Sequence, residues 1–186
     1  MRILLDTSSL NSLKGCPKNE LNKLTKKMRE KNVRLCTLFN SMEERNARED
    51  GVKDYQSMLR NMTEFAYQDL ELTISRSELN IPDITTKGLG KETTPFEIKL
   101  FKELKNIIKE CENNKGNKKT CKNLKIDSII GVSSLKYDIF ITSDDCLKRS
   151  LDKLIKKYEN EIPSPETYLV RSDKNDVLDE IYRHLQ

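Results

Sequence analysis

Short apolar runs predict buried strands at four places along the chain. The first covers residues 2–5 and stops at Asp6, where a cluster of hydroxyl side chains favours a turn into a helix. Three more strands are expected, at 33–38, 138–142 and 168–170. Residues 70–74 also alternate between apolar and polar positions, although a helix through Leu79 suits the same residues.

Apolar residues spaced three or four positions apart predict helices between these strands. They are expected at 18–31, 39–49, 52–67, 96–110, 120–136 and 147–158, with a last helix capped by Asp173. Strands that alternate with helices favour a parallel sheet covered on both faces. The predicted fold class is therefore α/β, a three-layer α/β/α arrangement around a central, mainly parallel sheet, within one domain over residues 1–186.

Composition excludes several kinds of chemistry. The chain has a single histidine, His184, so neither a two-histidine acid–base pair nor a His-rich zinc site can form. Its five cysteines include no C-x-x-C pair, which favours neither a disulfide framework nor a zinc ribbon; Cys111 and Cys121 alone flank a short polar stretch and could approach each other. With 30 Asp and Glu residues and no glycine-rich phosphate loop, catalysis would have to rest on carboxylates, through a metal.

The remaining bulk properties bear on location and partners. No apolar run approaches the roughly 20 residues of a bilayer-spanning helix, and the N-terminal run is too short for a signal peptide. A cytoplasmic protein is expected on these grounds. The net charge of +4 mildly favours an anionic partner. Lysine tracts such as 115–122 would hold an RNA backbone if they flank the acids, or else are solvated helix faces.

Acidic residues follow three of the predicted strands. Asp6 follows the first strand, Glu43 and Glu44 follow the second by one helical turn, and Asp144 and Asp145 follow the strand at 138–142. Asp127 lies inside the apolar pattern of a helix, where an acid is costly unless a cation or a donor offsets it. Carboxyl ends of parallel strands meet at one edge of the sheet, so four of these acids can converge there. Hard oxygen ligands of this kind suit Mg²⁺ or Mn²⁺.

Each of these acids also has an ordinary structural interpretation. Asp6 could serve as a helix N-cap. One of Asp144 and Asp145 could cap the helix that begins near Leu147, and Asp145 is favoured for that role. Glu43 and Glu44 could be neighbouring acids on a solvated helix face. It is the set of positions, rather than any one acid, that points to a metal site.

Two stretches carry a resemblance to a known family. Residues 4–10 (Leu-Leu-Asp-Thr-Ser-Ser-Leu) resemble the opening of PIN-domain ribonucleases. Residues 127–135, followed by a strand that ends in Thr-Ser-Asp at 142–144, are similar to the second half of that family. The resemblance implies Asp6, Asp127 and Asp144 as metal ligands. It also implies a catalytic glutamate at Glu44 or Glu43, with Glu44 favoured because Met42 precedes it by two residues, and supporting hydroxyls at Ser8 and Thr142.

The resemblance implies an Mg²⁺- or Mn²⁺-dependent endoribonuclease that hydrolyses RNA phosphodiester bonds. Many small members are toxins, neutralised by an antitoxin-like small protein and often dimeric. The stretch between Glu44 and Asp127 is longer than in compact members, so residues 68–95 and 112–119 are expected to be insertions or clamp segments. The alternative is a catalytically degenerate PIN-like domain that binds RNA or a protein. A phosphatase of the haloacid dehalogenase type is disfavoured, because Ser8 stands where its second Asp belongs.

Overall fold

The computed structural model describes residues 1–13, 16–38, 72–75, 94–171 and 173–186 of the 186-residue chain. In chain order the elements are β1 (Arg2–Leu5), α1 (Thr7–Leu13), α2 (Lys18–Glu30), β2 (Arg34–Leu38), β3 (Leu72–Ser75), α5 (Pro95–Asn114), α6 (Cys121–Ser134), β4 (Ile139–Thr142), α7 (Asp145–Lys157), β5 (Glu166–Leu169) and α8 (Lys174–Arg183). Strands and helices alternate as the sequence pattern predicts.

The strands form one parallel sheet in the order β3-β2-β1-β4-β5. The chain builds outward from β1 through β2 to β3, and then from β4 to β5 on the other side. The strand order therefore reverses between β1 and β4, where Leu4 pairs with Phe140 and Leu5 with Ile141. In open α/β sheets the crevice at such a reversal is the usual ligand site.

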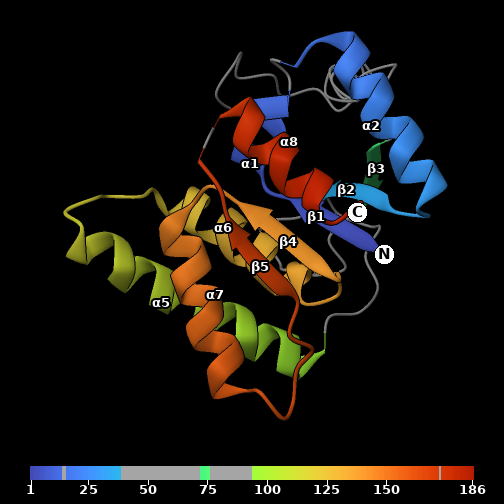
Figure 1. Cartoon of the computed structure of the whole chain (residues 1–186). Coiled ribbons are helices and arrows are strands. Elements are labelled where there is room, and N and C mark those ends of the chain that lie inside the picture. Colours follow the sequence, from blue (N-terminus) through green and yellow to red (C-terminus); the bar gives the residue numbers. More distant parts are fainter. Residues whose placement is uncertain (14–15, 39–71, 76–93, 172) are drawn as a thin grey trace, which may run out of the picture.

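Side chains of β1 alternate between two separate cores, one on each face of the sheet. Ile3 and Leu5 pack with the apolar residues of α1, α2 and α8. Leu4 and Phe140 pack on the opposite face, with those of α5, α6 and α7. Figure 1 shows the two helical layers on either side of the strands. The predicted α/β fold class, with three layers around a parallel sheet, is confirmed.

Helix α6 is buried on all sides from Ile126 to Ser134, whereas its first turn is partly exposed. It packs against both α5 and α7. Gly131 permits the close approach of α5, because a Cβ at this position would lie 2.5 Å from Leu104 Cδ2. A polar side chain in this buried part of α6, such as that of Asp127, is therefore largely enclosed by protein.

Some element boundaries differ from the sequence predictions. The ambiguous stretch at 70–79 contains a strand, β3. Helix α5 continues to Asn114, past the predicted end at residue 110, so the predicted segment 112–119 begins inside a helix. The predicted helices at 39–49 and 52–67 lie outside the described residues, as does most of 68–95. The assignment of 68–95 and 112–119 as insertions or clamps stays a prediction. None of the helices in the described part of the chain has the length and apolarity needed to cross a bilayer.

Candidate active site

A small pocket opens where the strand order reverses, at the carboxyl ends of β1 and β4. It is lined by Asp6, Thr7, Ser8, Lys119, Asn123, Asp127, Ile130, Asp144 and Leu147. Three of the predicted acids therefore meet there, from β1, α6 and the start of α7. The pocket measures about 80 Å³, which is room for a few water molecules or a small ion.

Asp6 is buried between the end of β1 and the first turn of α1, with 4% of its surface exposed. Its Oδ1 accepts a hydrogen bond from the Ser9 N–H at 2.7 Å. Its Oδ2 accepts from the Thr142 hydroxyl at 2.6 Å and from the Ser143 N–H at 3.3 Å. Burial raises the pKa of Asp6, and these hydrogen bonds, led by the one from Thr142, offset only part of that rise.

Asp144 is both the N-cap of α7 and a wall of the pocket. Its Oδ1 accepts from the Leu147 N–H at 2.9 Å. Its own N–H donates to the Thr142 hydroxyl at 3.0 Å. The hydroxyl of Thr142 thus hydrogen-bonds to both Asp6 and Asp144.

The expectation that Asp145 is the favoured N-cap is wrong, because Asp144 makes that contact. Asp145 instead pairs on the surface with Lys115 at 2.6 Å and with Arg149 at 2.8 Å. The hydrogen bond from Lys115 and the contact with Arg149 lower the pKa of Asp145. Asp145 does not line the pocket.

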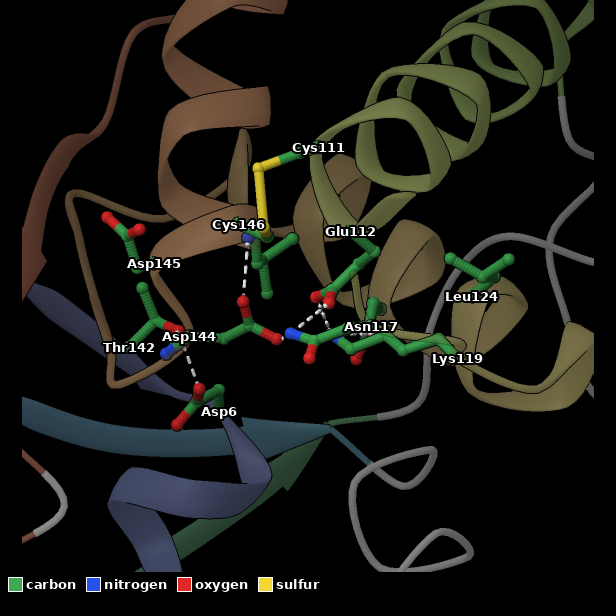
Figure 2. A network of polar contacts seen from close by, with 12 residues as sticks. Asp6, Cys111, Glu112, Asn117, Lys119, Leu124, Thr142, Asp144, Asp145 and Cys146 are labelled. Atoms are coloured by element: carbon green, nitrogen blue, oxygen red, sulfur yellow. Dashed lines mark hydrogen bonds and ion pairs between the residues drawn. A yellow bond between two sulfur atoms is a disulfide. The ribbon is translucent and has the colours of Figure 1, made fainter. Parts of the chain in front are cut away.

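Lys119 contacts three carboxylates, which come from α5, α6 and the start of α7. Figure 2 shows its side chain between those of Glu112 and Asp144. Its Nζ is 3.0 Å from Glu112 Oε1, at the end of α5, and 3.0 Å from Asp127 Oδ2, on α6. It also pairs with Asp144 Oδ2, at the start of α7. Burial disfavours the charged form, but the charges of Asp127 and Asp144 and their hydrogen bonds outweigh it, so the pKa of Lys119 is raised. Lys119 is therefore not a solvated lysine of the 115–122 tract.

Glu112 is a member of this cluster that the sequence pattern did not single out. It is buried, with 5% of its surface exposed. Its position was visible in the sequence, because it continues the row of buried residues spaced by four along α5, Leu100, Leu104 and Ile108. An acid in an apolar row signals a buried partner.

A disulfide joins Cys111, beside Glu112 on α5, to Cys146 in the first turn of α7. The expectation that the cysteines form no disulfide framework misses this bond, and the possible partner of Cys111 considered from the sequence, Cys121, is not bonded to it. Cys121 is exposed and has a free thiol. Because α5 packs against α7, the two bonded cysteines meet although 35 positions separate them.

The donor set suits a hard divalent cation. Asp6, Asp127 and Asp144 offer carboxylate oxygens alone, which is the chemistry that Mg²⁺ and Mn²⁺ prefer. Within the described ranges, however, no three His, Cys, Asp or Glu side chains stand ready to hold a metal ion. Lys119 supplies the positive charge beside Asp127 and Asp144. Ser8 lines the pocket, and Glu43 and Glu44 lie outside the described residues.

Comparisons with known proteins add little to this picture. No family model and no curated protein matches the chain. The chain is similar to the crystal structure of VapBC2 from Rickettsia felis bound to a DNA fragment from their promoter, with 15% identity and a TM-score of 0.40 over 91% of this chain and 98% of that one. A likeness of this size carries no argument about function.

Proposed function

We propose that the chain is an Mg²⁺- or Mn²⁺-dependent endoribonuclease of the PIN type, which hydrolyses RNA phosphodiester bonds. One observation carries the proposal: Asp6, Asp127 and Asp144 come from three separate elements and line one pocket at the reversal of strand order. The motif resemblance at residues 4–10 and 127–144 selects the same three acids.

In this proposal the three carboxylates hold the cation and the rest of the site orients them. Bound there, a divalent ion would polarise a phosphoryl oxygen and lower the pKa of an attached water. The Ser9 and Ser143 N–H groups and the Thr142 hydroxyl fix Asp6, and the Leu147 N–H fixes Asp144. Such fixed donors save the reorganisation that loose carboxylates would need. Glu44, or Glu43 in its place, is the fourth acid by resemblance.

The substrate class follows from charge and from the family resemblance. A net charge of +4 suits a phosphate backbone, and so do exposed lysines that are next in sequence to the pocket residues Lys119 and Asn123, namely Lys118 and Lys122. We expect RNA affinity to fall with salt, with a log–log slope of about −0.7 per phosphate contact on single strands. The resemblance also suggests an antitoxin-like small protein partner and a homodimer, which co-purification and size-exclusion chromatography would test. The cytoplasmic location expected from the sequence would be tested by cell fractionation.

A second candidate is a catalytically degenerate PIN-like domain that binds RNA or another protein. Lys119 favours it, because its ammonium already balances part of the negative charge of Glu112, Asp127 and Asp144. A site built only for stability would need no other cation. The two candidates differ in one observable: the nuclease cleaves RNA when a divalent metal ion is present, and the binding module does not.

A cleavage assay on single-stranded and structured RNA, in Mg²⁺, Mn²⁺ or EDTA, separates them. Asp6→Asn and Asp127→Asn should each lower the metal-dependent rate by at least about tenfold, a transition-state loss near 1.4 kcal/mol. Asp145→Asn is the matched control and should cleave like the wild type, because Asp145 lies outside the pocket. A wild-type rate no greater than that of buffer would leave the binding module as the better account.

The same assay assigns the glutamate. Neighbouring helical residues project about 100° apart, so one of Glu43 and Glu44 at most can face the pocket if that segment is helical. We expect Glu44→Gln to lower the rate by at least about tenfold and Glu43→Gln to leave it unchanged. The reverse result would move the role to Glu43 without affecting the nuclease proposal.

A further inference from the structure

Lys119 is partnered as completely as an ammonium group allows. A lysine head group carries three N–H donors. It meets three carboxylate oxygens, Glu112 Oε1, Asp127 Oδ2 and Asp144 Oδ2. The side chain is 22% exposed, so this charge is largely withdrawn from water. A lysine on the protein surface would leave most of its N–H donors to water, whereas each donor of Lys119 has a carboxylate acceptor.

The chain around Lys119 is fixed at both ends. Gly116 has φ +73°, a conformation that other residues rarely adopt, and it turns the chain back after α5. Asn117 then donates to the Glu112 carbonyl at 2.9 Å and to Glu112 Oε2 at 3.0 Å. One residue after Lys119, the Thr120 hydroxyl accepts from the Asn123 N–H and begins α6. The backbone conformation therefore holds Lys119 next to Glu112, Asp127 and Asp144.

Lys119 contacts one carboxylate oxygen of each of two proposed metal ligands, Asp127 and Asp144. Asp144 Oδ1 is engaged by the Leu147 N–H, and Asp144 Oδ2 pairs with Lys119. Asp127 also uses its Oδ2 for Lys119. An ammonium and a divalent ion on one oxygen repel each other strongly where water is scarce. Three carboxylates against one ammonium still leave negative charge that attracts a cation.

We propose that Lys119 is a built-in competitor of the metal ion. Without metal, its ammonium keeps Glu112, Asp127 and Asp144 together. Metal enters when the ammonium leaves Asp127 and Asp144 and stays with Glu112, so Lys119 lowers the metal affinity of the site. Lys119 is thus a positioning residue that acts through the two aspartates. This inference rests on the proposed function in one respect, since it takes the metal site to be the one proposed above.

The test is the dissociation constant of Mn²⁺, measured by calorimetry on the full chain without RNA. Lys119→Gln should bind Mn²⁺ at least about tenfold more tightly than the wild type, which corresponds to about 1.4 kcal/mol. Lys118→Gln is the matched control, since Lys118 is an exposed lysine of the same loop, and its affinity should equal that of the wild type. Lys119→Arg keeps the charge and should retain the weak affinity. Equal or weaker binding by Lys119→Gln would overturn the proposal.

A charge-matched variant separates competition for oxygen atoms from a general effect of charge. Glu112→Gln combined with Lys119→Gln removes one negative and one positive charge, so the charge of the cluster stays the same. It should still bind Mn²⁺ about tenfold more tightly than the wild type, because Asp127 and Asp144 are freed. A return to the wild-type affinity would overturn the proposal. This variant also answers the question if Lys119→Gln alone does not fold in EDTA.

Melting temperatures give a second readout. Lys119→Gln should melt below the wild type in EDTA, and Mn²⁺ should raise its melting temperature more than that of the wild type, because a ligand of the folded state stabilises by mass action. A deficit that is the same with and without Mn²⁺ would mark Lys119 as a scaffold lysine, against the proposal.

The failures of the two proposals can be told apart. Metal-dependent RNA cleavage with equal Mn²⁺ affinity in wild type and Lys119→Gln would overturn the competition and leave the nuclease. Tighter Mn²⁺ binding by the variants without cleavage by any of them would support the competition and remove the nuclease. Absence of Mn²⁺ binding to every variant would remove both.

Discussion

The carboxylates on the two sides of the pocket are neutralised in different ways. The described contacts of Asp6 come from neutral donors, two backbone N–H groups and the hydroxyl of Thr142. Asp127 and Asp144 contact an ammonium group, that of Lys119. The hydrogen bonds from these neutral donors only partly offset the cost of burying the Asp6 charge, so the pKa of Asp6 stays raised. A cation would therefore stabilise the Asp6 carboxylate more than the other two, because Asp127 and Asp144 already contact the ammonium group of Lys119.

The largest expected change in the free energy of unfolding comes from removing the disulfide, which joins α5 to α7 on the side of the pocket that contains Lys119. Cys111→Ser should destabilise the fold by about 2–4 kcal/mol, because the unfolded chain regains the freedom of a long loop. Urea unfolding followed by circular dichroism measures this. Cys121→Ser is the control and should unfold like the wild type, since Cys121 is free and exposed. Dithiothreitol should reproduce the loss in the wild type; an unchanged midpoint would show that the bond contributes nothing.

The next effect concerns Thr142, which connects the two sides. Thr142→Val keeps the shape but removes the donor to Asp6 Oδ2 and the acceptor of the Asp144 N–H. We expect a loss of about 1–3 kcal/mol, the cost of buried polar groups without partners. Denaturation of Thr142→Val alone and combined with Asp6→Asn gives the coupling between the two residues. If the two effects add, Thr142 and Asp6 do not interact in the folded state.

Asp6→Asn should change the free energy of unfolding by less than Thr142→Val does, and in the opposite direction. In EDTA at neutral pH the variant should be more stable by about 1 kcal/mol, because an amide avoids the cost of a buried charge. The folded-state pKa of Asp6 lies above its ordinary value of 3.8. Its contribution to wild-type stability is therefore full below that value and is lost as pH rises through the folded-state pKa.

The advantage of Asp6→Asn should accordingly be near zero at acidic pH and grow toward neutral pH. Urea midpoints measured in EDTA across this range would show it. An advantage that shrinks as pH rises would mean that the Asp6 carboxylate is stabilised by its surroundings, contrary to the direction of its pKa.

The smallest effect is expected at Asp145, outside the pocket. Asp145→Asn breaks two partly exposed ion pairs, with Lys115 and Arg149, and should change stability by less than about 0.5 kcal/mol. Its neighbour Asp144 is the contrast, because Asp144→Asn alters both a helix cap and the contact with Lys119. Similar thermal shifts for the two variants would remove the distinction between a pocket acid and a surface acid.

The sequence predicts the three aspartates of the pocket well, and the contacts of Glu112 and Lys119 poorly. Asp6 and Asp144 follow apolar strands, and Asp127 lies in an apolar helix, so local pattern and the rule for parallel sheets place all three. Lys119 sits in a stretch rich in Lys, Asn and Gly that is typical of a solvated loop, and Glu112, although it continues the apolar row of α5, lies where that stretch begins. Their contacts depend on the turn at Gly116 and on the packing of α5, α6 and α7, which a one-dimensional pattern does not contain.

The fold shows the same division. Apolar periodicity predicts most helices and strands to within a few residues, because burial of one face sets both period and length. The pairing of Cys111 with Cys146 depends on how two helices pack, and no spacing of cysteines along the chain indicates it. The sequence favours Asp145 as the N-cap of α7, whereas the N-cap is Asp144. The pattern does not separate these neighbours, because either one can follow the strand and begin the helix.

The Cys111–Cys146 bond also closes a covalent ring that contains Glu112, Lys119, Asp127 and Asp144. A protease that cuts at the exposed Lys115 or Lys118 would open the polypeptide within this ring without separating its parts. On a denaturing gel the nicked chain would run as one species until a reductant is added, and then as two. In an oxidising compartment, a cut in this loop would therefore leave the acids and their lysine on one covalently connected molecule.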